Sequence, residues 1–375
     1  MTANRNHTLY LVSAGIIWLI IQAAFLLSHG IALNGEPSKY INEANHFLNT
    51  GSLSSSNFRL YFVEILLIAL AIKSTVGYGL VIAVHLIVNL GATLMIYTFV
   101  SKVFSEKTGF FCAILFLLNI PLQEFNVYLQ TESLFYSFTI LFSLYLLSIQ
   151  NFTYKHAIFI LLSIALLSIT RPTGLLIIPP TFLYLFVRFN RSRYKKLQLS
   201  IASVLFIGFL FLLNNALGSG GEFDFMLPYQ YEHIICGLPT IDQPAVIKTT
   251  SNSNSLYGIV YYVANNMGQF IKLACLKTVA FLGLFRPYYS NAHNILLAVL
   301  FYPLYIAAIP GCKWWYTNRP YMLLFLTGMI VVTWSSVMIT CDDWHNRFFL
   351  SISFYVLILG LPAIHNLIKR LTSPK

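Results

Sequence analysis

The chain has 375 residues, of which 57% are hydrophobic and 9% are charged, and its formal net charge is +11. A soluble globular protein carries about 25% charged residues, so this composition excludes an ordinary soluble domain. Apolar runs of about 20 residues recur, each long enough to cross a hydrocarbon core about 30 Å thick. They predict an all-α polytopic membrane protein. Because Lys and Arg lie mainly in short loops between these runs, the positive-inside rule explains the charge and no nucleic-acid partner is expected.

The first two apolar runs are predicted to behave differently. Residues 8–28 are too long for the core of a typical signal peptide, so they are expected to remain as a membrane anchor. The next run, 59–76, contains the charged residues Arg59, Glu64 and Lys73, which are unfavourable in the middle of a bilayer. It is therefore predicted to lie on the outer surface as an amphipathic helix and not to span.

Basic loops order the spans in the middle of the chain. The strongest of them, residues 188–196, holds three Arg and two Lys and is predicted to be cytoplasmic. Counting crossings back from that loop gives a consistent alternation between the two sides. The spans predicted in this part are 79–100, 108–128, 131–149, 156–170, 173–187 and 198–217.

The C-terminal half begins with residues 218–255, whose Gly, Ser, Asn and Pro content is typical of a loop or lid. The run 256–285 contains Lys272 and Lys277, and the same count of crossings predicts that it stays outside. The remaining predicted spans are 294–311, 320–340 and 347–364. The total is about ten transmembrane helices, and both termini are expected to be cytoplasmic.

This alternation divides the chain into three parts. Residues 1–217 are predicted to form a transmembrane module that includes the first outer loop and surface helix at 29–78. Residues 218–293 would form an extracytoplasmic loop with an interfacial helix. Residues 294–375 would supply the last transmembrane helices and a basic cytoplasmic tail.

Patterns typical of metal and redox sites are weak. The five cysteines are scattered without a Cys-x-x-Cys pair and are interpreted as free packing thiols. His345 follows Asp342 and Asp343, but no second His lies at ligand spacing, so no metal site is predicted. No motif implies a cofactor, and the sequence leaves open whether a divalent metal assists.

Charged residues gather in the segments that are predicted to face outward, although the whole chain has only 12 Asp and Glu. The set is Glu36, Lys39, Glu43, Arg59, Glu132, Arg171, Lys272, Lys277, Arg286, Asp342, Asp343, His345 and Arg347. Arg and Lys bind phosphate, and a carboxylate beside them can take a proton from an incoming hydroxyl or amine. Each residue alone also fits a solvated charge, a helix cap or an interfacial anchor, so the prediction of group transfer from a lipid phosphate depends on their co-location.

Several short motifs follow one another in a recognisable order. They are Glu36-Pro37-Ser38-Lys39-Tyr40, Leu48-Asn49-Thr50-Gly51, Arg59 with Gly77, Thr131-Glu132, Arg171-Pro172-Thr173-Gly174 and Arg347-Phe348. In this order the chain resembles the GT-C superfamily of integral membrane glycosyltransferases. The protein O-mannosyltransferases and the lipid A aminoarabinose transferases are the most similar families within it.

The resemblance implies a GT-C-like bundle with amphipathic helices on its outer surface. It implies transfer of a sugar, with inversion, from a polyprenyl-phosphate donor to a lipid, glycan or protein acceptor on the extracytoplasmic face of the inner or plasma membrane. Glu36 would be the general base, and the donor phosphate would be held by Lys39, Arg59 and Arg347. The supporting residues would be Tyr40, Glu43, Glu132, Arg171 and His345.

Two other functions stay open at this point. A transporter or flippase of a lipid-linked sugar would place polar residues near mid-bilayer on broken helices and would show paired repeats, neither of which is evident in the sequence. A polymerase or ligase of surface polysaccharide would favour a larger outer loop with several Arg. A purely structural membrane protein would not need carboxylates and guanidinium groups on one surface.

Overall fold

The computed structural model describes residues 2–189, 195–218, 224 and 226–372, and the regular secondary structure of this part of the chain is helical, with only isolated β-bridges besides. The middle of the predicted basic loop (190–194) and part of the predicted Gly-rich loop (219–223) lie outside the described residues. The chain forms two compact units, and each is considered by itself. Unit 1 consists of Met1–Ile177, Leu304–Met322 and Leu357–Lys375, and unit 2 consists of Ile178–Pro303 and Leu323–Val356.

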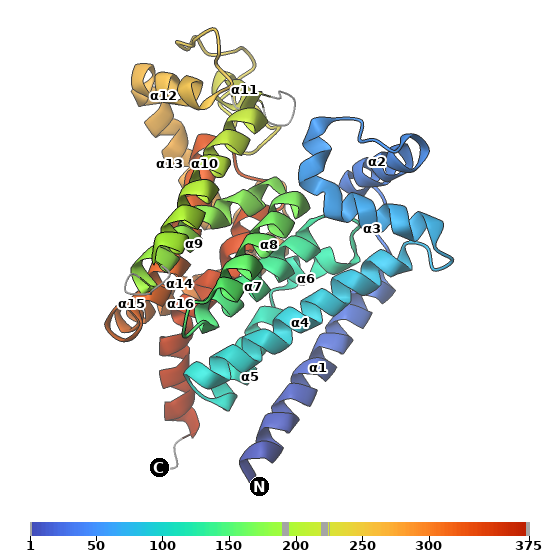
Figure 1. Ribbon diagram of the computed structural model, residues 1–375, viewed down its shortest axis with the longest axis vertical. Helices are drawn as coiled ribbons and strands as arrows, with labels where there is room; N and C mark the ends of the chain where they lie inside the picture. Colours follow the sequence, from blue (N-terminus) through green and yellow to red (C-terminus); the bar gives the residue numbers. More distant parts are fainter. Residues whose placement is uncertain (1, 190–194, 219–223, 225, 373–375) are drawn as a thin grey trace. The chain divides into compact units, whose positions relative to one another are not determined.

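Unit 1 begins with eight α-helices and three short 3-10 helices, coloured from blue to green in Figure 1. Helix α4 packs against α1, α5 and α7, and α7 packs against α8, so these helices form a bundle. The elements are α1 (Thr2–His29), α2 (Glu36–Thr50), η1 (Ser56–Tyr61), α3 (Phe62–Lys73), α4 (Gly79–Val103), α5 (Glu106–Leu117), α6 (Ile120–Glu124), η2 (Phe125–Val127), α7 (Glu132–Ser148), α8 (Tyr154–Thr170) and η3 (Pro172–Ile177).

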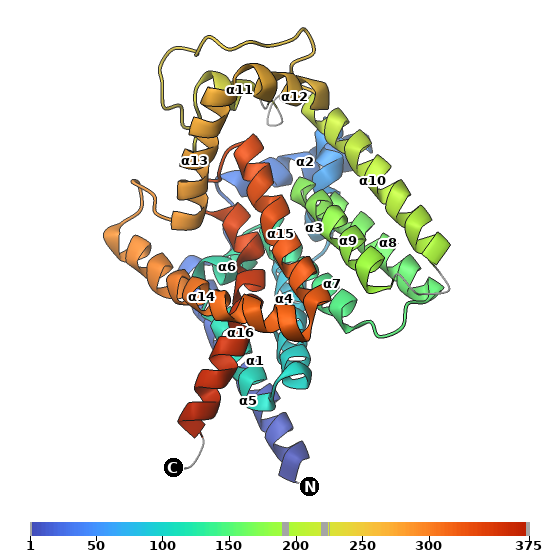
Figure 2. The same ribbon diagram turned by 90° about the vertical axis from the view of Figure 1, so that its left-hand side faces the viewer.

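Unit 2 begins with five α-helices, and three long C-terminal helices contribute residues to both units. One end of α10 lies against α12 (Figure 2), where Leu217, Tyr229 and Tyr262 belong to one buried apolar cluster. The helices are α9 (Ile178–Arg188), α10 (Lys195–Gly218), α11 (Met226–Gln230), α12 (Leu256–Asn265), α13 (Met267–Gly283), α14 (Asn291–Asn318), α15 (Pro320–Ile339) and α16 (Arg347–Thr372).

Five helices within the described residues are long and apolar enough to cross a membrane, which confirms a multi-pass membrane protein. They are His7–His29, Gly79–Val103, Asn291–Asn318, Pro320–Ile339 and Arg347–Leu371. The predicted span 108–128 is broken, because Glu106–Leu117 and Ile120–Val127 meet at an angle of 65°. Counted as one span, this bent pair is a sixth candidate.

The predicted total of about ten spans is not confirmed. The predicted spans 131–149, 156–170 and 173–187 correspond to shorter apolar helices, among them α7 and α8 with 17 residues each. A helix of that length is about 26 Å long, which is less than the hydrocarbon thickness of about 30 Å. The predicted span 198–217 lies in the 24-residue helix α10, which is not among the spanning candidates. The sidedness of the helices and the three-part division of the chain stay predictions.

The two runs that were predicted to lie on the membrane surface are not among the spanning candidates. The run 59–76 forms part of η1 and the 12-residue helix α3, and the run 256–285 forms α12 and α13, which meet at Asn266. Helix α2 precedes η1 and packs against α3. It ends at Gly51, whose φ of 71° closes the helix in the left-handed conformation that glycine adopts without strain.

The interpretation of all five cysteines as free thiols is wrong. Cys236 and Cys341 form a disulfide in unit 2, across a sequence separation of 105 residues. The backbone NH of Cys236 also donates a hydrogen bond to the carbonyl of Asp342 at 2.8 Å. Their spacing did not predict the pairing, since only the fold brings the two segments together. Structural disulfides persist in oxidising compartments, which suits an extracytoplasmic position of this loop.

Candidate functional site

Glu36 is the first residue of α2, so the predicted loop carboxylate belongs to a helix. Gly35 before it has a φ of 78°, and Pro37 occupies the first turn, where its missing NH removes no helical hydrogen bond. A carboxylate at this position interacts favourably with the positive end of the helix dipole. Glu36 is only partly buried, and its Oε1 accepts a hydrogen bond from the Tyr40 hydroxyl one turn later at 3.3 Å.

Three charged residues of unit 1 act on the buried Tyr40 hydroxyl. Burial raises the pKa of Tyr40 well above its usual value, and the negative charges of Glu132 and Glu36 raise it further, while Arg171 opposes them. Electrostatic effects of this kind act over short distances in a buried site. Unit 1 therefore brings together Glu36, Tyr40, Glu132 and Arg171, all of which were predicted site residues.

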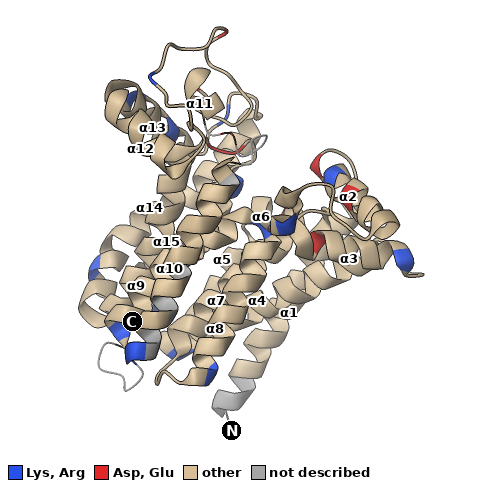
Figure 3. Cartoon of the chain, turned by 45° about the horizontal axis from the view of Figure 1, so that its top comes forward, with Lys and Arg blue, Asp and Glu red and all other residues tan. Residues whose placement is uncertain are grey.

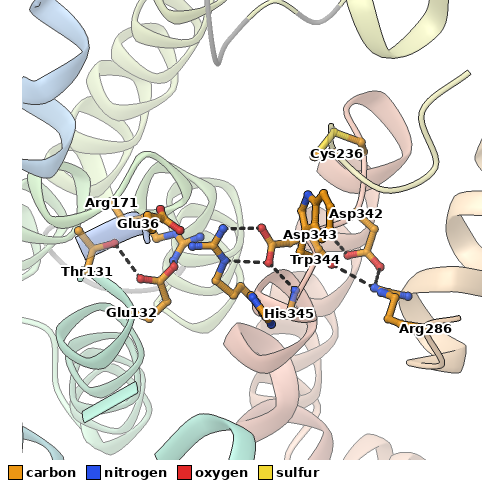
Figure 4. A network of polar contacts seen from close by, with 12 residues as sticks. Glu36, Thr131, Glu132, Arg171, Cys236, Arg286, Asp342, Asp343, Trp344 and His345 are labelled. Carbon is orange, nitrogen blue, oxygen red and sulfur yellow. Dashed lines mark hydrogen bonds and ion pairs between the residues drawn. A yellow bond between two sulfur atoms is a disulfide. The ribbon is translucent and has the colours of Figure 1, made fainter. Parts of the chain in front are cut away.

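Glu132 and Arg171 form an ion pair between the start of α7 and the turn that follows α8. Glu132 is fully buried, Arg171 is 9% exposed, and the Thr131 hydroxyl donates to the second carboxylate oxygen of Glu132 at 3.4 Å (Figure 4). Gly174 allows the turn to close, because a Cβ there would collide with the backbone carbonyl of Leu167. The Arg-Pro-Thr-Gly motif thus has a steric reason.

Lys39 lies among aromatic rings, one of which is Tyr40. Its Nζ is 4.7 Å from the ring centre of Tyr61, 5.5 Å from Tyr40 and 5.8 Å from Phe58. Cation–π contacts of this kind hold an ammonium group in place while leaving it positively charged. Arg59 is exposed on η1, next to Phe58, so both cations belong to the α2–η1 region, where Figure 3 shows acidic and basic residues of unit 1 together.

Glu43 lies further along α2 and has a structural partner. Its two carboxylate oxygens accept hydrogen bonds from the backbone NH and the hydroxyl of Ser54, at 2.7 and 2.5 Å. These bonds fix the segment between α2 and η1. Glu43 is itself buried. It stabilises the segment that connects Lys39 on α2 with Arg59 on η1.

Asp342 and Arg286 form a fully buried ion pair in unit 2, with 2.5 Å between Oδ2 and Nη2 (Figure 4). Oδ1 of Asp342 accepts the backbone NH of Asp343 at 2.8 Å. Burial raises the pKa of Asp342 to about 6, and the Arg286 guanidinium partly opposes this change. Neither residue was among the predicted site residues, although both belonged to the outward-facing set.

The two predicted site residues of unit 2, Arg347 and His345, lie around Asp343. Arg347 donates two hydrogen bonds to the Asp343 carboxylate, from Nε at 2.7 Å and from Nη2 at 2.8 Å. The backbone NH of His345 donates to the same carboxylate at 3.0 Å, while its side chain is exposed. The cation of Arg347 is therefore neutralised within its own loop, and its predicted role at a donor phosphate stays a prediction.

Lys277 is the most deeply buried cation of unit 2. Its Nζ donates to the backbone carbonyl of Thr340 at 2.5 Å, just after the end of α15, and lies 4.6 Å from the ring centre of Tyr229. Burial lowers the pKa of Lys277 to about 7. Carbonyls at the end of a helix attract a cation, so this contact explains Lys277 structurally.

The sequence reasoning missed a buried polar network inside unit 1. Gln22 of α1 donates to Gln123 of α6 at 2.9 Å, Asn126 donates to Gln22 at 3.2 Å, and Ser133 of α7 donates to Asn126 at 2.6 Å. The sequence did contain a signal for this network, because its members are single polar residues within apolar runs. These residues meet where the bent pair α5 and α6–η2 changes direction.

His85 lies in an apolar run and was expected to be a buried, hydrogen-bonded histidine, but its partner on α3 was not predicted. His85 Nε2 and Glu64 Oε2 share a hydrogen bond of 3.1 Å, and both side chains are fully buried. Glu64 thus explains how the run 59–76 accommodates one of its charges, by pairing it with a neighbouring helix instead of exposing it to lipid.

No group of three or more His, Cys, Asp or Glu within the described residues could hold a metal ion. The cluster around Tyr40 instead combines a partly exposed carboxylate, a buried ion pair and two cations at the surface of unit 1. Such an arrangement can accept a proton and stabilise negative charge without a metal ligand set. Neither a scan against protein-family models nor a search of the curated proteins found a match, so a function must be inferred from this geometry.

Proposed function

We propose that the protein transfers a sugar from a polyprenyl-phosphate donor to an acceptor at the extracytoplasmic surface of the membrane. The observation that supports this function is the cluster around the Tyr40 hydroxyl, in which Glu36 lies partly exposed beside the buried pair of Glu132 and Arg171. Buried charges are unfavourable unless they are paired, and a pair that supports a partly exposed carboxylate is typical of a site that uses it.

Glu36 would act as the general base. The acceptor oxygen attacks the anomeric carbon, its proton passes to the Glu36 carboxylate, and the bond from the anomeric carbon to the phosphate oxygen breaks. The electron pair of that bond leaves with the phosphate, and attack from the opposite face inverts the configuration. Tyr40 donates to Glu36 and orients it, and its own raised pKa keeps the hydroxyl protonated at neutral pH.

Lys39 and Arg59 would stabilise the departing phosphate. They lie within the α2–η1 region, whose geometry Glu43 fixes through Ser54. Arg171 is already paired with Glu132 and would shape the site instead of binding phosphate.

The experiment that tests this function is the substitution Glu36→Gln. Removal of a general base lowers the rate by about 100-fold to 10,000-fold, so transfer from a radiolabelled polyprenyl-phosphate sugar should be lost while the protein remains folded. The matched control is Glu232→Gln, because Glu232 is a carboxylate of unit 2 that pairs with the exposed side chain of Lys272. The control should retain transfer.

Normal turnover in the Glu36→Gln variant, at an unchanged melting temperature in detergent, would remove Glu36 from the reaction. A loss of transfer that is equally large in the Glu232→Gln control would show a general effect of charge removal. Either outcome contradicts the assignment of the base to the start of α2.

A transporter of a lipid-linked sugar is a second candidate, and a specific observation favours it. The bent pair α5 and α6–η2 is a broken helix, and Gln22, Gln123 and Asn126 form a polar network beside the break. Transporters place such networks on discontinuous helices. Purified protein in lipid vesicles distinguishes the two functions, since a transporter moves the lipid-linked sugar between leaflets without breaking its bond to phosphate.

A further inference from the structure

Helices α4, α7 and α8 of unit 1 line a pocket of about 500 Å³. Its walls are Met95 of α4, residues of α7 from Phe138 to Tyr145, and residues of α8 that end at Leu167. Only Ser163 and Tyr145 bring polar side-chain atoms to these walls. The volume is in the range of small-molecule sites, but a wall of this composition excludes a polar or charged ligand.

The pocket opens on the outer surface of α8. Phe159, Leu162 and Leu166 line it and are also exposed, with Leu162 exposed to 65%. A row of exposed apolar side chains on an apolar helix of a membrane protein faces hydrocarbon and not water. A hydrocarbon chain can therefore enter the pocket sideways, from the lipid phase.

Two of the three helices that line the pocket, α7 and α8, lead to the ion pair of the candidate site. Helix α7 begins at Glu132, and Phe138 follows six residues later, which is about 9 Å along the helix. Helix α8 ends just before Arg171, and Leu167 lies four residues before it, about 6 Å along the axis. Measured along the two helix axes, the pocket walls thus begin within about 10 Å of the pair of Glu132 and Arg171 and continue away from it.

An amphipathic ligand fits this arrangement. Its charged head would lie at the cluster around Tyr40, and its chain would continue between α7 and α8. Three Phe side chains and one Tyr line the walls, and their flat faces pack against the methyl branches of an isoprenoid chain. Since lipid is as apolar as the pocket, the selectivity would come from this packing and not from transfer out of water.

We propose that the pocket between α4, α7 and α8 binds the isoprenoid chain of the lipid-phosphate donor. The inference rests on the proposed function, because that function supplies a donor with a phosphate head and an isoprenoid chain. It adds the part of the protein that recognises the chain. Ser163 is the position where a larger side chain would fill the pocket without removing a buried apolar group.

The test uses a polyprenyl phosphate that carries a photoreactive diazirine on its chain, with the full-length protein in detergent. Mass spectrometry after illumination should locate the cross-links on α7 and α8. In Ser163→Trp the yield should fall by about tenfold, the size expected when a hydrophobic pocket loses its fit to a ligand. In the control Ile158→Trp, at a position of α8 that is 53% exposed and outside the pocket walls, it should stay within about twofold.

If Ser163→Trp fails to fold, the cross-linking yield can be measured in Leu166→Trp, which changes a partly exposed position of the same wall. Cross-links that persist in both pocket variants, or that lie on helices other than α4, α7 and α8, would overturn the proposal. Equal competition by excess phosphatidic acid would also overturn it, because the pocket would then accept any lipid chain. The cross-linking experiment measures binding without turnover. A failure of the proposed sugar transfer and a failure of chain binding in the pocket can therefore be told apart.

Discussion

Each unit contains a buried acid–arginine pair, but the two pairs have different surroundings. In unit 2, both oxygens of Asp342 accept hydrogen bonds, from Arg286 and from the backbone of Asp343. The disulfide from Cys236 to Cys341 fixes the same loop. In unit 1, the pair of Glu132 and Arg171 lies beside a further carboxylate that is only partly buried.

The difference separates a structural pair from one that supports a reactive group. The loop of Asp342 is held by a covalent bond, an ion pair and backbone hydrogen bonds, so its charges serve to hold one conformation. Glu36 lies at the start of a helix, where one Tyr hydroxyl orients it and solvent still reaches it. A base must be accessible to its substrate, and this condition is met in unit 1 and not by Asp342.

The largest effect is expected when one member of a buried pair is removed. Arg171→Met and Arg286→Met should each lower the free energy of unfolding by about 3–5 kcal/mol, because each leaves a carboxylate buried without its cation. Melting temperatures in detergent measure this loss.

Variants in which both charges are removed sharpen the comparison. Glu132→Gln with Arg171→Met should recover stability but not transfer, whereas Asp342→Asn with Arg286→Met should recover both. Full transfer in the first double variant would mean that the pair of unit 1 is as purely structural as the pair of unit 2.

The disulfide of unit 2 is expected to have the next largest effect. Replacing Cys236 and Cys341 by Ser should reduce the stability by about 2–5 kcal/mol, since the bond closes a loop of about 100 residues and restricts the unfolded chain. Addition of a reductant should lower the melting temperature of the native protein and leave that of the variant unchanged. A variant as stable as the native protein would show that the loop is held by Asp342 and Arg286 alone.

Lys277 makes the stability depend on pH. Its pKa is near 10.5 in the unfolded chain and about 7 in the folded protein, so the unfolded state binds more protons between these values. The free energy of unfolding should therefore rise with pH across this window, by up to about 1.4 kcal/mol per pH unit. This contribution is lost as the pH falls through the folded pKa of about 7. Lys277→Met should flatten this dependence, as measured by melting temperatures from pH 6 to pH 10.

The same slope in the native protein and in Lys277→Met would mean that Lys277 stays charged when folded. Its contacts with the carbonyl of Thr340 and the Tyr229 ring would then suffice to hold an ammonium ion. The pH window would have to come from another group.

The smallest effect is expected at Arg59, which is exposed on η1. Arg59→Ala should raise the KM for the donor about fivefold, corresponding to about 1 kcal/mol for a solvated cation, and change the KM for the acceptor less. Steady-state kinetics with each substrate varied in turn measure the two values. A larger change for the acceptor would move Arg59 away from the donor phosphate.

The sequence alone predicted the membrane class and most helices, and it predicted that the runs 59–76 and 256–285 do not span; neither run is among the spanning candidates of the structure. These features are local, because the transfer of a residue into lipid depends mainly on its own chemistry and on that of its immediate neighbours. The charges near α2 and η1 can likewise be read directly from the sequence. The sequence could not predict the total number of spans, since helix length and the bend before α6 depend on packing.

Tertiary structure decided which charged and polar residues meet. Glu132 and Arg171 are 39 residues apart in the chain, Arg286 and Asp342 are 56 apart, and the two bonded cysteines are 105 apart. The sequence supplied each of these residues but not its partner. Burial makes an unpaired charge unfavourable, and only the folded arrangement of helices determines which distant residue can satisfy it.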